Sequence, residues 1–382
     1  MNSRHADSSP YLVAGVTGRA LAASARRGGH RVIVLDYFAD RDCAQQAVAC
    51  RAVVSRRALR FDARALLAAA ATLAPAARTK GLVYGSGFEG RTSLLRRLAA
   101  RRRLFGNPPE VVEAIKDPAV FFPMLDRLGM AHPETRLTPP SDAAGWLVKR
   151  TGGAGGVHVR QAGPGRSWAG RYFQRFQPGI PLSALFLADG QRACVLGFNR
   201  QWTTAARAEL PYQFGGAVGG IALPRRTAAE IIAGLDRLVA ATGLVGLNGV
   251  DFLLAHGAWS VLEVNPRPTA TFELYDPDYP RGLFDRHLRA CEGELPSRLP
   301  TPRACRAVAV AHAAQSWSLP PDFSFPRWCR DLPQAESRLA PGDPVCTVHA
   351  RAADARLAAL LARRRIARLA RMLAGTTIVA RA

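Results

Sequence analysis

The stretch "VLEVNPRPTA" (residues 261–270) begins as a β-strand and ends with an arginine between two prolines. Side chains alternate along a strand, so Glu263 and Asn265 lie on the same face. An apolar strand gains nothing in folding from a carboxylate and an amide two residues apart. The polar pair, followed at once by Arg267, therefore indicates a binding site at the end of this strand.

The strand before it, "LNGVDFLLA" (247–255), adds a third oxygen. We expect a three-residue turn, His256-Gly257-Ala258, which would place Asp251 opposite Glu263 on the same face. Carboxylate and amide oxygens suit Mg²⁺ or Mn²⁺ far better than zinc, so Asp251, Glu263 and Asn265 are candidate metal ligands. The competing interpretation is that these carboxylates point into solvent from a half-exposed sheet.

A second motif, "GWLVKRTGGAGGVHVR" (145–160), predicts a strand, a glycine-rich turn and a returning strand. It lacks the helix and the G-K-[ST] ending of a Walker loop. Glycines still allow backbone N–H groups to approach a phosphate closely. The candidate phosphate-binding residues are Lys149, Gly152, Gly153, Gly155 and Gly156, and the alternative is a flexible hairpin tip.

Lysine is rare in this chain, because only Lys80, Lys116 and Lys149 occur among 52 basic residues. A compact ammonium grips phosphate oxygens in a tight cleft differently from a planar guanidinium. Where arginine has replaced lysine almost everywhere, the surviving lysines mark positions that a guanidinium would not serve. Lys116 and Lys149 are therefore candidate phosphate ligands before any family is considered.

Residues 11–105 alternate between strand and helix patterns, which predicts a parallel sheet with right-handed crossovers. We expect an α/β N-terminal domain, followed by α+β lobes, over residues 1–105, 106–175, 176–295 and 296–382. The last of these reads as a small β-rich appendage with a terminal helix. "GVTGRAL" with Asp36 is similar to a dinucleotide fingerprint but lacks its third glycine, so an NAD(P)-dependent oxidoreductase stays an alternative.

Composition limits the remaining function classes. The formal charge of +23 allows a basic nucleic-acid-binding scaffold, but the arginines are spread over all segments and form no patch. Steering of an anionic small substrate is the use that we expect for this charge.

The seven scattered cysteines form no C-x-x-C pair, and no apolar run is long enough for a membrane span. We expect a cytoplasmic protein that neither enters a membrane nor binds nucleic acid.

The order of these parts resembles the ATP-grasp superfamily over about residues 10 to 290. Lys116 on a helical linker, Lys149 before a glycine hairpin, "QRFQPG" as a strand break and "GVDF…LEVNPRP" carry the likeness, and the last motif is the most specific. The resemblance implies a Rossmann-like first domain, two lobes that clamp ATP, and a carboxylate–amine ligase that passes through an acyl phosphate. ATP and Mg²⁺ (or Mn²⁺) are the implied cofactors.

The resemblance also implies roles for single residues. Lys116 and Lys149 would hold the α- and β-phosphates, and the glycines of 152–156 would close over them. Arg267 would stabilise the transferred phosphoryl group. The metal ligands would be Asp251, Glu263 and Asn265, and the hinge that reads adenine would be Gln174, Arg175 and Phe176.

Two departures from the family pattern stand out. The hinge has no glutamate, since Arg175 and Pro181 lie where one is usual. Gly249 stands where an arginine usually precedes the first metal ligand, so that role would pass to Arg267 or Arg200.

Three further segments resemble ATP-grasp proteins of tetrahydromethanopterin- and methylofuran-linked one-carbon metabolism, such as tyramine–glutamate ligase. They are "LEVNPRPTATFELYD", "GGAVGG" and "PGDPVCTVHARAADA". The likeness implies a carboxylate and an amine as small-molecule substrates, one of them acidic, and glutamate addition in the biosynthesis of a one-carbon-carrier cofactor. The C-terminal region would pack on the first lobe or form a homodimer.

Overall fold

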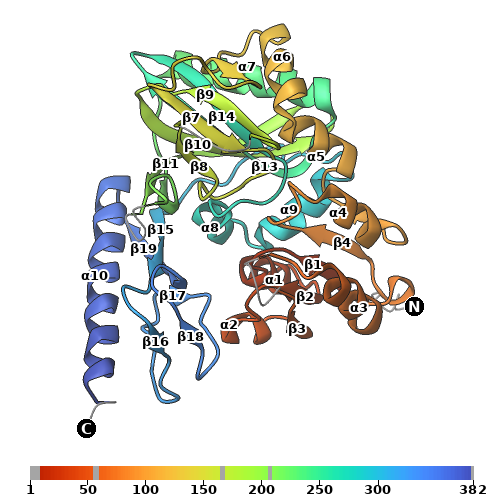
Figure 1. The fold of residues 1–382 in the computed structure, drawn as a ribbon. Coiled ribbons are helices and arrows are strands. Elements are labelled where there is room, and N and C mark those ends of the chain that lie inside the picture. The colour runs from red at the N-terminus through yellow and green to blue at the C-terminus, as the bar shows by residue number, and fades with distance from the viewer. Residues whose placement is uncertain (1–8, 55–59, 164–167, 205–208, 380–382) are drawn as a thin grey trace.

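The computed structural model describes residues 9–54, 60–163, 168–204 and 209–379. Two large sheets, a smaller sheet and a short ribbon make up the protein, with the N-terminal domain below the lobes and a long C-terminal helix along one side (Figure 1). The predicted mixed architecture, with a parallel N-terminal sheet followed by antiparallel sheets, is confirmed.

The N-terminal sheet is parallel with the order β3-β2-β1-β4-β5. Its central strands are buried along their whole length, as expected when helices cover both faces of a parallel sheet. The strands are β1 (Tyr11–Ala14), β2 (Val32–Asp36), β3 (Ala49–Ala52), β4 (Gly81–Tyr84) and β5 (Leu104–Phe105). The helices between them are α1 (Arg19–Arg27), α2 (Arg41–Ala44), α3 (Ala63–Leu73), the 3₁₀ turn η1 (Ala76–Arg78) and α4 (Thr92–Ala99).

Two linker helices lead into the small lobe, as the sequence predicts. They meet at Asp117, whose side chain accepts a hydrogen bond from Ala119 N and so caps the second helix. The small lobe is an antiparallel sheet with the order β6-β9-β7-β8. These elements are α5 (Pro109–Lys116), α6 (Pro118–Arg127), β6 (Thr135–Arg136), β7 (Trp146–Arg150), β8 (Val159–Gln161) and β9 (Arg171–Arg175).

The large lobe is built on an eight-stranded antiparallel sheet with the order β14-β13-β10-β11-β12-β15-β19-β17. One face packs against α7 (Arg225–Thr242) through a core that includes Phe186, Val250, Phe252 and Leu235. The strands are β10 (Ile180–Asp189), β11 (Ala193–Thr203), β12 (Phe214–Gly219), β13 (Val245–Ala255), β14 (Ala258–Asn265), β15 (Cys305–His312), β17 (Cys329–Arg330) and β19 (Pro344–Ala352).

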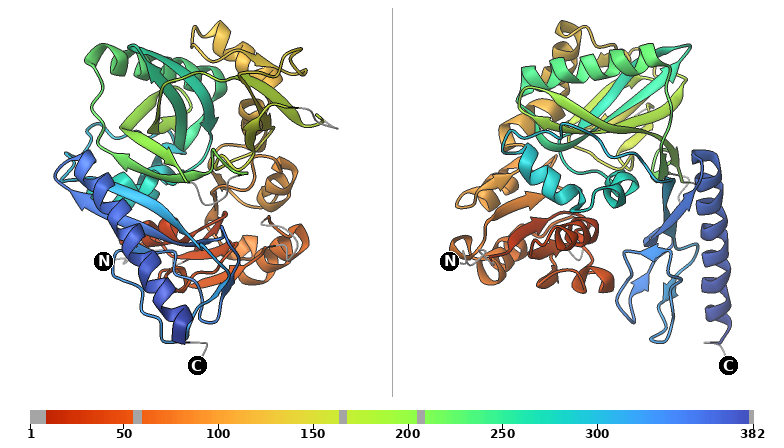
Figure 2. Two further views of the ribbon diagram at one scale, coloured as in Figure 1. Left: turned by 60° about the vertical axis from the view of Figure 1, so that its left-hand side comes forward. Right: turned by 180° about the vertical axis from the view of Figure 1, so that it is seen from behind.

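The C-terminal region is joined to the large lobe through this sheet, because β12 pairs with β15 from Gly216↔Ala309 to Val218↔Ala307. The long helix α10 (Ala355–Val379) buries Ala358 and Ala362 against the same strands, and Figure 2 shows it lying across them. The remaining elements are α8 (Phe272–Tyr275), η2 (Asp276–Asp278), α9 (Gly282–Ala290), and the ribbon of β16 (Trp317–Ser318) with β18 (Arg338–Leu339). Within the described residues, no helix is both long and apolar enough to span a membrane.

A buried arginine ties three parts of the chain together. Arg19 on α1 donates to both carboxylate oxygens of Glu273 on α8, at 2.5 and 2.7 Å, and its Nε lies 3.0 Å from Asp331 Oδ1 in the C-terminal region. Asp42 on α2 accepts from the backbone N–H groups of Asp331 and Leu332. These contacts fix the N-terminal domain against α8 and against the C-terminal region.

Asp40 lies beside this junction with more negative than positive charge around it. Its Oδ2 is buried and has no hydrogen-bond partner among the described residues. Burial, and then the charges of Asp331, Asp36 and Asp42, raise the pKa of Asp40 to about 9. The folded protein therefore keeps this carboxyl protonated at neutral pH, whereas the unfolded chain ionises it near its ordinary pKa of 3.8.

We predict that Asp40→Asn stabilises the protein increasingly as the pH rises. The folded protein holds the proton of Asp40 more tightly than the unfolded chain does. The protonated carboxyl therefore contributes fully to the free energy of unfolding below the unfolded-state pKa, and this contribution is lost as the pH rises from about 4 to about 9. The neutral amide removes this loss. Thermal unfolding of the variant and the wild type should coincide near pH 4.5 and separate in favour of the variant by pH 8.

The matched control is Asp322→Asn, since Asp322 is exposed in the C-terminal region. Its thermal transition should follow the wild type at every pH. An Asp40→Asn protein that is less stable than the wild type at pH 8 would mean that the ionised carboxylate is needed at the junction.

Candidate active site

The hairpin β13–β14 brings the three predicted metal ligands together, but by a different turn from the one predicted. The turn has two residues, His256 and Gly257, both at positive φ, between the paired residues Ala255 and Ala258. The prediction of a three-residue turn is wrong. A β-bulge between Asp251 and Phe252 restores the register, so that Asp251 still pairs with Glu263.

The three side chains contact one another. Asn265 Nδ2 donates to Asp251 Oδ2 at 3.0 Å and lies 3.5 Å from Glu263 Oε1. Gln201 on β11 donates to the other oxygen of Asp251 at 2.6 Å. Gln201 is a site residue that the sequence analysis missed, because nothing local in "FNRQW" distinguishes it from other strand glutamines.

Two neighbouring, partly buried carboxylates share this corner, and the charge of Glu263 opposes the ionisation of Asp251. Burial, and then the charge of Glu263, raise the pKa of Asp251. Burial acts in the same direction on Glu263, but the positive charges of Lys116 and Lys149 outweigh it and lower the pKa of Glu263. A divalent cation among these oxygens would relieve this repulsion, so the donor set suits Mg²⁺ in both chemistry and charge.

Both predicted lysines lie at this corner. Lys116, at the end of α5, places Nζ 3.3 Å from Glu263 Oε2 and 3.2 Å from Asn265 Oδ1. Lys149 on β7 is buried and donates to Gln174 Oε1 on β9 at 2.5 Å. Burial lowers the pKa of Lys149 to about 8, although the charges of Glu263 and Asp251 work against this shift.

The glycine-rich turn between β7 and β8 reaches across to two other segments. Gly152, at φ +66°, lies so close to the N-terminal domain that a Cβ would be 2.5 Å from Gly90 Cα and 2.8 Å from Glu89 O. A Cβ on Gly156 would overlap the carbonyl of Tyr212. Phe214 N also donates to Gly155 O at 3.0 Å. The turn thus sits between the N-terminal domain and the start of β12.

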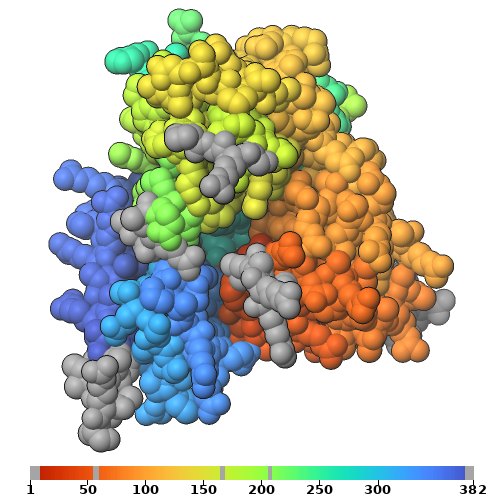
Figure 3. All heavy atoms as spheres, viewed as in Figure 1, coloured from red at the N-terminus to blue at the C-terminus, as the bar shows by residue number. Residues whose placement is uncertain are grey.

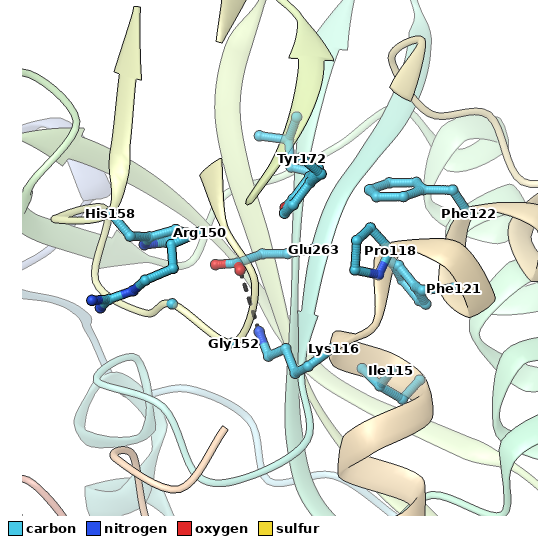
Figure 4. Close-up of a pocket in the computed structure, with 12 residues that line it drawn as sticks. Ile115, Lys116, Pro118, Phe121, Phe122, Arg150, Gly152, His158, Tyr172 and Glu263 are labelled. Carbon is cyan, nitrogen blue, oxygen red and sulfur yellow. Dashed lines mark hydrogen bonds and ion pairs between the residues drawn. The ribbon is translucent and has the colours of Figure 1, made fainter. Parts of the chain in front are cut away.

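A pocket lies between this turn and the linker helices (Figure 4). Glu263 occupies its centre, with Lys116 on one side and His158 and Arg150 on the other. Tyr172, Phe122 and Phe121 supply an apolar wall. In the space-filling view the surface is hollowed where the small lobe, the N-terminal domain and the C-terminal strands meet (Figure 3).

The predicted hinge residues, Gln174, Arg175 and Phe176, do not line this pocket. Gln174 is buried and holds Lys149. The N–H groups of Arg175 and Phe176 already donate to the carbonyls of Glu134 and Gly145. The Arg175 guanidinium lies over the Trp146 ring, 5.5 Å from its centroid, and Phe176 is half exposed. Neither N–H group is therefore free to read a base in this conformation.

Arg267 is buried and fixed by a residue that the sequence analysis missed. Its Nε donates to Glu89 Oε1 at 2.5 Å, and its Nη2 lies 3.4 Å from Asn265 Oδ1. The charges of Arg267 and Lys116 overcome the effect of burial and lower the pKa of Glu89. The expected substitute Arg200 is exposed and belongs to the opposite face of β11 from Gln201, so of the two only Arg267 lies at the site.

Comparison with known proteins agrees with this arrangement. Residues 110–271 match the ATP-grasp domain family. A search of curated protein sequences found no match.

Several solved structures share the fold. Biotin carboxylase from Campylobacter jejuni, in a β,γ-ATP complex, superposes with a TM-score of 0.71 at 14% identity, over 91% of this chain and 88% of its own. The MgADP-bound biotin carboxylase domain of 2-oxoglutarate carboxylase from Hydrogenobacter thermophilus superposes with a TM-score of 0.71 at 12% identity, over 91% of this chain and 87% of its own. N5-carboxyaminoimidazole ribonucleotide synthetase from Thermus thermophilus superposes with a TM-score of 0.67 at 18% identity, over 94% of this chain and 98% of its own.

Residues 110–271 thus match the ATP-grasp domain family, the chain shares the fold of these solved structures, and the predicted fold class is confirmed. The predicted class of ATP-dependent ATP-grasp enzyme and the predicted cofactors, ATP with Mg²⁺, agree with the family match.

We predict that Gly152→Ala weakens MgADP binding much more than Gly155→Ala. Both residues have positive φ, so both variants carry backbone strain. Only a Cβ at position 152 meets the backbone of Glu89 and Gly90, whereas one at position 155 has nothing within 4 Å. Calorimetry should show an affinity at least about tenfold lower for Gly152→Ala than for Gly155→Ala, a difference of ~1.4 kcal/mol. Equal losses would show that contact with the N-terminal domain is irrelevant to binding.

Proposed function

We propose that this chain is an ATP- and Mg²⁺-dependent carboxylate–amine ligase that forms an amide through an acyl phosphate. The observation that carries the proposal is the corner where Asp251, Glu263 and Asn265 contact one another beside Lys116. A partly buried pair of carboxylates flanked by two lysines contributes nothing that a sheet or a scaffold needs. It suits a divalent cation with a phosphate chain.

The nucleotide-binding roles follow from this geometry. Lys149, held in place by Gln174, and Lys116 would bind the α- and β-phosphates, and the backbone N–H groups of residues 152–156 would cover them. Asp251, Glu263 and Asn265 would hold Mg²⁺, which neutralises the charge on the phosphate oxygens when bound. The hinge would contribute through Gln174, since the N–H groups of Arg175 and Phe176 have other partners.

Arg267 would act on the transferred phosphoryl group. Its ion pair with Glu89 fixes the guanidinium at the junction of the N-terminal domain and the large lobe. A rigidly held cation stabilises developing charge without having to reorganise during the reaction. The carboxylate oxygen of the substrate would attack the terminal phosphorus and release ADP. The amine would then displace phosphate from the acyl phosphate.

We propose the domain division 1–105, 106–175, 176–295 and 296–382 as functional units. The last unit is joined to the large lobe through the pairing of β12 with β15. Its docking at Arg19 and Asp42 supports a role in holding the cleft.

Two observations weigh against a nicotinamide oxidoreductase on the N-terminal domain. Asp36, which would bind a ribose, is fully buried and accepts hydrogen bonds from the N–H groups of Gly18, Phe38 and Ala39. The second observation is that Asp331 lies against the turn between β1 and α1, where its carboxylate accepts a hydrogen bond from the Thr17 hydroxyl. No observation favours a nucleic-acid scaffold over the ligase.

For the substrates, we propose glutamate addition in the assembly of a one-carbon carrier of the methylofuran or tetrahydromethanopterin type, in the cytoplasm. This finer assignment rests on the likeness of "LEVNPRPTATFELYD", "GGAVGG" and "PGDPVCTVHARAADA" to ligases of that metabolism. The charge of +23 supports an acidic co-substrate, because a positive field raises the local concentration of anions.

We predict that Glu263→Gln and Lys149→Met each reduce ADP release by at least about 100-fold, the scale expected when a metal site is disrupted. The first removes a metal-binding charge and the second a phosphate-binding charge. Coupled-enzyme kinetics measures the rate, and thermal unfolding checks that the fold is kept. The control is Glu230→Gln on the exposed face of α7, which should retain wild-type turnover. Near-wild-type ADP release by either site variant would overturn the site assignment.

We further predict that ADP and phosphate form rapidly only when an acid and an amine are both present. An acyl phosphate that is shielded from water persists until the amine reaches it. A screen that crosses glutamate and other acids with amine-bearing one-carbon cofactor precursors measures this. Equal turnover with ATP alone would identify an ATPase and contradict the ligase function.

A further inference from the structure

His158 is a pocket residue to which neither the family resemblance nor the proposed mechanism gives a role. It lies just before β8, on the returning limb of the glycine-rich hairpin, and lines the same pocket as Lys116 and Glu263. Figure 4 shows its ring on the opposite side of Glu263 from Lys116. Its Nδ1 is buried and makes no hydrogen bond of ordinary geometry to any described residue, and the backbone of Ala154 lies close enough to the ring to raise its pKa. A buried polar nitrogen without a partner is costly, and in a binding pocket it marks a ligand contact.

The hairpin is shaped around this imidazole. Gly153 has a negative φ, so the backbone there does not require glycine. A Cβ at that position would nevertheless lie 2.2 Å from His158 Cγ and 2.4 Å from its Cδ2. The absence of a side chain at position 153 is therefore what gives the ring its place beneath the turn. The ring is a packed part of the loop and not a mobile surface group.

The charges around the ring place it near the phosphate-binding lysines. Burial is the largest cause that lowers the pKa of His158 to about 4. The positive charges of Lys149 and Lys116 act in the same direction, whereas the charge of Glu263 and the backbone of Ala154 act against this shift. The imidazole is therefore neutral at pH 7. A neutral imidazole carries its proton on one nitrogen and can donate it in a hydrogen bond without adding charge.

We propose that His158 is a phosphate ligand of this site, which donates Nδ1–H to an oxygen of the β-phosphate that ADP and ATP share and AMP lacks. The inference rests on the proposed function, because it places the diphosphate beside Lys116 and Lys149. His158 then closes the wall of the pocket that faces Lys116. The glycine-rich hairpin contributes a side-chain donor in addition to its backbone N–H groups.

The test compares MgADP and AMP binding by calorimetry in three variants. His158→Ala should weaken MgADP about tenfold, the effect of one hydrogen bond to a charged group, and leave AMP unchanged. His158→Asn keeps an N–H donor near the position of Nδ1 and should recover most of the affinity. His158→Gln places its donor near Nε2 and should not. The matched control is His256→Asn at the exposed hairpin tip, where asparagine tolerates the positive φ and binding should be unchanged.

A double-mutant cycle separates ligation from simple packing. Gly153→Ala should displace the ring and weaken MgADP in the wild type, but should cost little more in the His158→Ala background. Unchanged MgADP affinity in His158→Ala would overturn the proposal, and so would recovery by glutamine in place of asparagine. If Lys149→Met still abolishes MgADP binding in that case, only the role of His158 fails. If Lys149→Met binds normally, the proposed function fails with it.

Discussion

The repulsion between two partly buried carboxylates on neighbouring strands is the constraint around which the site is organised. Asp251 and Glu263 pair across the β13–β14 ladder, where burial alone would favour their neutral forms. Lys116 and Lys149 supply the positive charge that keeps Glu263 ionised, and Gln201 and Asn265 satisfy the oxygens of Asp251. The two lysines therefore offset the negative charge of this corner. The same positive charge would bind a phosphate chain that accompanies a divalent metal.

Several separate segments hold this corner in position. The bulge after Asp251 sets the register, and the linker helix α5 ends at Lys116. Glu89 in the N-terminal domain fixes Arg267 through a buried ion pair. Farther away, Arg19 joins α1 to Glu273 on α8, eight residues beyond Asn265. The N-terminal domain therefore acts as one wall of the cleft, which explains why its glycine-bearing turn at Gly90 meets the phosphate-binding hairpin.

Much of this arrangement could be predicted from the sequence, for physical reasons that can be named. Strand alternation places Glu263 and Asn265 together, and the scarcity of lysine singles out Lys116 and Lys149. Their roles as ligands remain proposals. The prediction of the turn at His256 was wrong because two arrangements place Asp251 opposite Glu263. One is a three-residue turn without a bulge, and the other is the observed two-residue turn with a bulge. Glu89 and Gln201 were missed because their partners lie 178 and 50 residues away, and only tertiary structure brings them together. The sheet shared by β12 and β15 was missed for the same reason.

The most direct test of this account is a crystal structure with Mn²⁺ and a non-hydrolysable ATP analogue, in which anomalous scattering locates the metal. The account predicts a metal peak bonded to oxygens of Asp251, Glu263 and Asn265 at ~2.1 Å, the length usual for Mg²⁺. The phosphate chain should lie between that peak and the two lysine ammonium groups. Metal and nucleotide bound elsewhere, with Lys116 still paired to Glu263, would contradict it.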